Sequence, residues 1–290
     1  MKLILLVILS SFCILSFSQH RKINSKGVQI IKNSTLIIQK TGKYSNSQNL
    51  LSAINELWTI GEKGGLYNKE GVKEQLKSNK NIISISLGKR TSYSRSSDTN
   101  PKPMTISKTW QLEIKDNNGK TLYLYSIPFN LSDHSIDKVH FYSAISVMNR
   151  ALETMDELNF KKKAALYNHI DNNIFTLKKL TLVIPSNLIS SSVKLADVQE
   201  YYNLPVKIVS KREWEDIITN KTKGYAYLIT IPRPTNGEYQ ILHSLVEAST
   251  SDCLAILFPN KVVNPAWTAM PVVTFNALQH YQRFFKKKLK

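Results

Sequence analysis

The chain has 290 residues, of which 42% are hydrophobic, and it carries a formal net charge of +18. This length accommodates one large domain or two ordinary ones, and the hydrophobic content is ample for a packed core, which excludes disorder over the body of the chain. The excess of cations favours anionic partners such as lipid headgroups, acidic glycans or nucleic acid, although the lysines are also spread along the chain as on an ordinary solvated surface.

Residues 1–18 have the pattern of a secretory signal peptide. A short positive region precedes an apolar run over residues 3–15, which is too short to span a bilayer, and small Ser16 and Ser18 occupy the positions that a signal peptidase recognises. We therefore expect cleavage before Gln19. The mature protein would be exported, periplasmic or outer-membrane-associated, and without a transmembrane span.

The rest of the chain predicts an α/β (α+β) protein built from two tandem repeats. A polar leader is expected over residues 19–34, the first repeat over 35–158, a linker over 159–180 and the second repeat over 181–290. Each repeat has the order strand, helix, helix, three-strand antiparallel meander and closing helix, so each would form a mixed sheet covered by helices. Since both repeats also begin with similar residues, Thr-Leu-Ile-Ile and Thr-Leu-Val-Ile, we interpret them as a duplication.

The elements of the first repeat are predicted from changes in the apolar period. Helical spacing indicates two short helices and a long closing one, a period of two indicates the strands, and an Asn-Gly turn joins the last two strands. The glycine-rich residues 59–67 and the polar residues 89–102 are expected to be irregular. The strands are expected at residues 35–38, 82–87, 110–114 and 122–125, and the helices at residues 51–58, 72–76 and 141–155.

The second repeat shows the same patterns more clearly. Ser210, with Glu213 three residues later, predicts the capped start of a short helix. Pro232 and Pro234 are expected to end the strand that begins at Tyr225. The strands are expected at residues 181–184, 206–209, 225–231, 239–246 and 253–258, and the closing helix is expected to direct Val272, Phe275, Leu278, Tyr281 and Phe285 inward.

A family resemblance rests on the second repeat. The strand at residues 206–209, the Arg-Glu-Trp helix at 212–214, the strand at 224–229 and the strand end at 245–248 follow one another in this order. Over about residues 181–286 the chain resembles the periplasmic TolB amino-terminal domain and the related domain of the curli-secretion lipoprotein CsgG. The resemblance implies an α/β fold, an envelope location and a role in protein contacts or assembly without catalysis. In its signal and its lysine- and asparagine-rich make-up, the chain is also similar to exported proteins of Bacteroidetes-type bacteria.

After cleavage, Cys253 would be the one cysteine left, so no intrachain disulfide is expected. It lies in an apolar strand and has no local cation or imidazole to stabilise a thiolate. We interpret it as a small buried hydrophobe.

Motifs typical of hydrolases, phosphate-binding loops and zinc sites are absent from the sequence. The best candidate for metal chemistry is the trio His134, Asp137 and His140, whose spacing of three could place two imidazoles and a carboxylate on one helical face. In the alternative interpretation, Asp133 or a neighbouring serine caps the helix, Asp137 complements its dipole and the histidines are solvated. No cofactor is expected.

A basic loop is the first candidate binding segment. Lys89, Arg90, Tyr93 and Arg95 alternate cations with an aromatic ring, which is a pattern typical of nucleic-acid or glycan contacts. In the alternative interpretation, the loop is an ordinary polar surface segment.

The basic tail is the second candidate. Lys286, Lys287 and Lys288 follow the apolar end of the closing helix. These lysines either complement the negative end of the helix dipole or contact a membrane surface.

Together these features predict a non-enzymatic exported cell-envelope protein that acts as a protein-interaction or assembly module on an envelope protein or anionic surface. One alternative is a binding module for an anionic polymer such as lipopolysaccharide, acidic glycan or nucleic acid. A second alternative is a metal-dependent hydrolase that uses the histidine trio.

Overall fold

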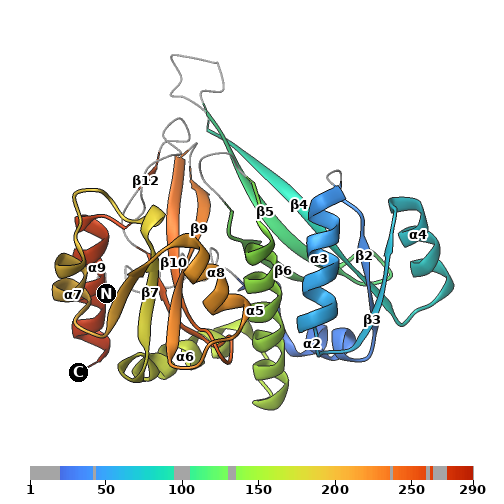
Figure 1. The fold of residues 1–290 in the computed structure, drawn as a ribbon. Helices are drawn as coiled ribbons and strands as arrows, with labels where there is room; N and C mark the ends of the chain where they lie inside the picture. Colours follow the sequence, from blue (N-terminus) through green and yellow to red (C-terminus); the bar gives the residue numbers. More distant parts are fainter. Residues whose placement is uncertain are drawn as a thin grey trace, which may run out of the picture.

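Two mixed β-sheets, with helices between and outside them, form the framework of the protein (Figure 1). The computed structural model describes residues 20–41, 44–94, 105–129, 135–235, 238–258, 262–263 and 273–289. In the first sheet the strand order is β1-β6-β5-β4-β2-β3, where β2 runs parallel to β3 and β4 and the remaining pairs are antiparallel. Its strands are β1 (His20–Arg21), β2 (Thr35–Gln39), β3 (Glu62–Tyr67), β4 (Ile82–Ser94), β5 (Thr105–Lys115) and β6 (Thr121–Ile127).

The second sheet has the order β11-β10-β9-β7-β8, with the short β12 paired to β10. Again the first strand in sequence, β7, runs parallel to both of its neighbours, and the meander β9-β10-β11 is antiparallel. Its strands are β7 (Thr181–Pro185), β8 (Val206–Val209), β9 (Tyr225–Thr235), β10 (Glu238–Glu247), β11 (Cys253–Leu257) and β12 (Val262–Val263).

The two sheets therefore share one strand order, since β3-β2-β4-β5-β6 corresponds to β8-β7-β9-β10-β11. The helices correspond as well: α3 (Tyr44–Leu57) to α7 (Leu195–Tyr202), α4 (Lys69–Ser78) to α8 (Lys211–Thr219), and α5 (Lys138–Glu157) to α9 (Phe275–Lys288). The predicted α/β class is confirmed, but the order predicted for the first half omitted β3, the strand that lies between α3 and α4. Duplication as the origin of this likeness stays a prediction.

Helix α5 is the central element of the molecule. Fifteen of its 20 residues are buried, because it packs on the first sheet with α3 and also contacts α8 and the second half. A helix that is apolar around most of its circumference has to be enclosed on several sides. One apolar core consequently includes Leu152 and Met148 of α5 together with Tyr227 and Val246 of the second sheet.

Two further apolar clusters complete the layers. On the opposite face of the second sheet, α7 and α9 cover Leu228 and Leu245 with Tyr202, Leu278 and Tyr281. On the outer face of the first sheet, α4 covers a smaller cluster of Ile37, Val72 and Ile82. Both sheets are therefore enclosed by helices, as the predicted architecture requires.

The segment predicted as a polar leader is structured. It contains β1, which pairs with β6, and the helix α2 (Ser25–Lys32), whose Val28 and Ile31 are buried. The side chain of Asn24 caps α2 by accepting a hydrogen bond from the Gly27 N–H at 2.9 Å. The prediction was wrong because two apolar residues on one face are enough for a helix this short to pack on a neighbour.

Residues 159–180 were predicted to be a linker, but most of them form helices. These are α6 (Lys163–Asn172) and the 3-10 helix η1 (Asn173–Lys179). Leu166 and Ile170 enter the core shared by both halves, whereas Ile174 and Leu177 enter the core under α7 and α9. The connection is therefore a packed part of the fold.

The segment predicted to be irregular at residues 59–67 forms β3, an edge strand parallel to β2. Its glycines permit close approach rather than preventing a strand. Gly61 has φ +72°, and a Cβ there would lie 2.6 Å from the Ile31 carbonyl oxygen, while a Cβ on Gly64 would lie 2.7 Å from the Ile37 side chain.

Residues 89–94 of the predicted polar loop are strand, because β4 continues to Ser94 and pairs with β5 in an antiparallel ladder that ends at Ser94 and Thr105; the rest of the predicted loop lies outside the described residues. Likewise, β9 continues past Pro232 to Thr235 in register with β10. Proline is tolerated there because, among the described residues, β9 pairs with β7 only as far as Tyr227 and is an edge beyond it.

The closing helix α9 buries Leu278, Tyr281 and Phe285 as predicted. Phe275, which was predicted to face inward, is instead 37% exposed, and its ring lies edge-on to that of Tyr201. It lies in the first turn of α9, at the rim of the apolar cluster. Val272 lies outside the described residues.

Candidate anion-binding surface

Of the candidate metal trio, the structure describes Asp137 and His140, and both take part in the start of α5. Asp137 is the N-cap residue of α5, and its backbone N–H donates to Nδ1 of His140 at 3.0 Å. The Asp137 carboxylate forms an ion pair with Lys211 of α8 at 2.6 Å. These contacts agree with a helix-end role for Asp137, but the capping residue is Asp137 rather than Asp133 or a neighbouring serine, and His140 is buried rather than solvated. His134 lies outside the described residues. Within the described part of the chain, no group of three or more His, Cys, Asp or Glu side chains could hold a metal ion.

The thiol of Cys253 is buried, as predicted, and its Sγ lies 3.8 Å from the carbonyl oxygen of Ala255. Burial raises the pKa of Cys253 to about 12, so the thiol is protonated at neutral pH. This supports its interpretation as a small buried hydrophobe.

The predicted basic loop and basic tail lie on different parts of the molecule. Lys89 lies on β4, with its Nζ 5.1 Å from the centre of the Trp110 ring. Arg90 and Tyr93 also lie on β4, but their side chains and the whole of Arg95 are outside the described part. Figure 1 shows the β4–β5 hairpin extending at the top, whereas the carboxy-terminal end of α9 lies at the lower left. The two segments therefore do not form one site.

The tail joins a second basic segment that the sequence analysis missed. The apolar face of α9 anchors the helix on the second sheet, and its last turn carries Lys286, Lys287 and Lys288. Lys178 of η1 donates a hydrogen bond to the carbonyl oxygen of Leu289 at 3.2 Å, which places η1 against the end of α9. Together the residues Phe175, Lys178, Lys179, Lys286, Lys287 and Lys288 form a surface that we call the basic end.

The charges of the basic end are poorly balanced. Lys288 forms an ion pair with Asp171 at 2.7 Å. In the part of the chain that the structure describes, the ammonium groups of Lys178, Lys179, Lys286 and Lys287 form no ion pair with a carboxylate. Some of this charge complements the negative end of the α9 dipole, but four unpaired cations exceed the partial charge of one helix end.

An aromatic side chain projects from the same surface. Phe175 is 50% exposed, which is the largest exposed fraction among the large hydrophobic residues described as exposed. The Nζ of Lys178 lies 5.4 Å from the centre of its ring. An exposed aromatic ring beside several lysines is the composition of surfaces that lie at a lipid–water interface.

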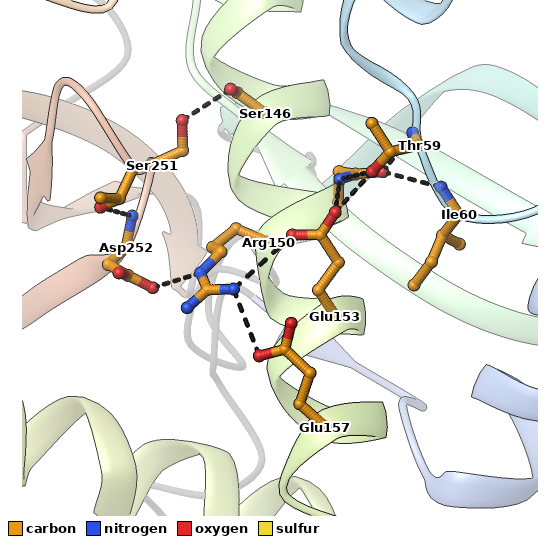
Figure 2. Close-up of polar contacts among 10 residues, drawn as sticks. Thr59, Ile60, Ser146, Arg150, Glu153, Glu157, Ser251 and Asp252 are labelled. Carbon is orange, nitrogen blue, oxygen red and sulfur yellow. Dashed lines mark hydrogen bonds and ion pairs between the residues drawn. The ribbon is translucent and has the colours of Figure 1, made fainter.

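A polar network on α5 joins the two halves but is structural (Figure 2). Toward the first half, Asn149 accepts hydrogen bonds from the N–H groups of Thr59 and Ile60 at 2.9 and 3.3 Å. Toward the second half, Arg150 Nε donates to Asp252 at 2.7 Å, and Ser146 and Ser251 share a hydrogen bond of 2.6 Å. Every member thus has a partner in the fold, so the network fixes the position of α5.

The fold and the basic end define a two-sheet α/β protein with a cationic, partly aromatic surface. No protein-family model, curated protein or solved structure matches the chain. The TolB-like and CsgG-like resemblance therefore stays a prediction. None of the helices in the described ranges is both long and apolar enough to cross a membrane.

Proposed function

We propose that this protein is a non-enzymatic, exported envelope protein that docks on an anionic phospholipid surface through the basic end. The observation that carries the proposal is the hydrogen bond from Lys178 to Leu289, which joins the two lysines of η1 and the half-exposed Phe175 to the end of α9 with its three lysines. Among the described residues, Asp171 is the one carboxylate in an ion pair with these lysines. Cations contribute long-range attraction to the headgroups, and the aromatic ring can enter the headgroup layer.

The shape of the basic end supports a surface rather than a pocket as its partner. Lys286 and Lys287 are exposed at the end of α9, and Lys178 and Lys179 are exposed at the end of η1. The apolar side chains beneath them, Leu177 and Phe285, are buried in the core under α7 and α9. The lysines are therefore presented outward by a rigid base, as contact with an extended anionic surface requires.

Sedimentation with phospholipid vesicles tests this proposal. The protein should bind vesicles that contain phosphatidylglycerol and not vesicles of phosphatidylcholine alone, and binding should weaken steeply with added salt. Since each lysine near such a surface contributes about 1 kcal/mol, Lys286→Gln combined with Lys287→Gln should weaken binding by roughly 30-fold at low salt. Phe175→Ala should weaken it further by removing the apolar contact.

A matched control separates the basic end from net charge. Lys73→Gln combined with Lys77→Gln removes the same charge from exposed positions of α4, which lies on the other side of the molecule in Figure 1. This variant should bind nearly as well as the unmodified protein. An equal loss of vesicle binding in both variants would show that binding depends only on net charge. Binding that does not change with salt would indicate an apolar partner. Either result contradicts the proposal.

A further inference from the structure

A second cationic feature lies on the first half of the protein, far in sequence from the basic end. A cleft of about 680 Å³ opens between the start of α2, the junction of α4 with β4, and the turn that joins β5 to β6. Four lysines from these segments line it, namely Lys22, Lys26, Lys80 and Lys120. We call this feature the lysine cleft. Its volume lies in the range of small-molecule sites.

The lysine cleft has almost no negative charge to offset these cations. Among the described residues, its single acidic lining residue is Asp116, which is buried and already engaged in the β5–β6 turn. The Asp116 Oδ1 atom accepts hydrogen bonds from the N–H groups of Asn118 at 3.0 Å and Lys120 at 2.8 Å. Among the residues of the described ranges, none forms an ion pair with any of the four lysines.

The backbone holds the lysines in place from several sides. Helix α2 passes close to β6: a Cβ atom added to Gly27 of α2 would lie 3.4 Å from the carbonyl oxygen of Leu122 of β6. This close approach brings the segment that carries Lys26 next to the segment that carries Lys120. Lys22 adopts φ +59°, in the left-handed region that costs a lysine about 1 kcal/mol. Such a conformation persists only where the surroundings enforce it. The convergence of like charges is therefore built into the fold.

We infer that the lysine cleft binds a compact anion carrying phosphate groups. Four ammonium groups supply point charges for several phosphate oxygens, and the side-chain amides of Asn24, Asn81 and Asn117 line the same space and can donate hydrogen bonds. No aromatic residue lines the cleft within the described part of the chain, so a nucleobase would find no ring on which to stack. A phosphate ester or short polyphosphate without an aromatic ring fits this lining best.

Isothermal titration of the full chain with inorganic pyrophosphate and with tripolyphosphate, at constant ionic strength, tests the inference. Saturable binding of one anion per chain is expected. Lys26→Gln combined with Lys120→Gln should raise the dissociation constant at least tenfold. The charge-matched variants Lys73→Gln with Lys77→Gln, and Lys286→Gln with Lys287→Gln, should leave it within about twofold, because they lie outside the cleft.

The same variants distinguish the possible sources of the phosphate group. If the cleft variant weakens binding of pyrophosphate but not of phosphatidylglycerol vesicles, the ligand is a soluble phosphate compound. If it weakens both, the cleft takes phosphate from lipid headgroups. Two results would overturn the inference: equal weakening of pyrophosphate binding by all three variants, or no saturable binding by the unmodified chain. Neither result would affect the proposal that the basic end binds vesicles, because that proposal is tested separately.

Discussion

Among the buried polar side chains of the described residues, His20 is the most informative. Its ring is fully buried, its Nδ1 contacts the hydroxyl of Tyr123, and the rings of Tyr125 and Tyr167 lie edge-on to it. Burial lowers the pKa of His20 to about 3, because the charged imidazolium would lose its hydration there. The neutral ring is therefore part of the native packing.

This pKa predicts a loss of stability in acid. The unfolded chain protonates His20 near its ordinary pKa of about 6.5, so between about pH 6.5 and pH 3 the unfolded state binds one more proton than the native state. The contribution of neutral His20 is complete above that window and is lost as the pH falls through it, by up to about 1.4 kcal/mol per pH unit. Urea unfolding at about pH 7 and about pH 5 measures it.

His20→Gln is the matched variant, since glutamine keeps a polar group but does not titrate. Between about pH 7 and pH 5 the unmodified protein should lose up to about 2 kcal/mol more stability than His20→Gln. Arg150, Asp252 and His169, which line the small cavity beside His20, are common to both proteins and cancel in the comparison. Parallel stability curves for the two proteins would show that His20 does not titrate as described.

Among the helices and strands, α5 shows how two sheets are fixed against each other. Its buried polar residues divide between the halves, with Asn149 directed to the first and Ser143 and Ser146 directed to the second. Apolar packing is tolerant of small displacements, whereas hydrogen bonds in a nearly buried setting are lost when the helix shifts or rotates. These bonds therefore determine the register of α5.

A double-mutant cycle on Arg150 and Asp252 measures the link from α5 to the second half. Their side chains are 30% and 22% exposed, so Arg150→Met and Asp252→Asn should show a coupling energy of about 1 kcal/mol. The surface pair Lys207 and Glu213, with exposed fractions of 53% and 44%, is the control and should couple by less than about 0.5 kcal/mol in urea unfolding. Equal coupling in both cycles would mean that the α5 pair contributes no more than an ordinary surface ion pair.

Most elements were predictable because their signals are local. Ser210 accepts from the Glu213 N–H at 3.1 Å, as the capping pattern predicted, and the turn at residues 116–119 closes with Gly119 at φ +75°. The errors arose where the local sequence is typical of a loop but the backbone pairs with a neighbouring strand in the folded protein. The hairpin beyond Lys89 is stabilised by backbone bonds to β5, and β3 is stabilised by β2 despite its glycines.

The chain as a whole has two topologically alike halves that share their largest core, although the second half also has its own cluster under α7 and α9. The core around α5 contains residues of both sheets, so cutting the chain after α5 would expose apolar surface on both pieces. Similar strand order in the two halves therefore does not make them independent domains.

We predict a single cooperative unfolding transition. Trp58 of the first half and Trp214 of the second are both buried and report on the two halves separately. In urea, the midpoint from far-ultraviolet circular dichroism should coincide with that from fluorescence, both in a variant that keeps only Trp58 and in one that keeps only Trp214, with the other three of the four tryptophans changed to phenylalanine. Separated midpoints, or a folded and soluble fragment of residues 159–290, would contradict the shared core.

The amino-acid order was sufficient to predict the α/β class, most of the strands and helices outside residues 19–34, 59–67 and 159–180, the buried Cys253 and the basic tail, because periodicity, capping and turn patterns act between neighbours. It was not sufficient to predict that α5 would be enclosed by both halves, that Lys178 would meet the end of α9, or that Lys22, Lys26, Lys80 and Lys120 would line one cleft. Those arrangements join segments far apart along the chain. Local patterns specify which face of an element is apolar, but the free energy of burying that face is similar for many partners, and only packing of the complete set of elements selects one.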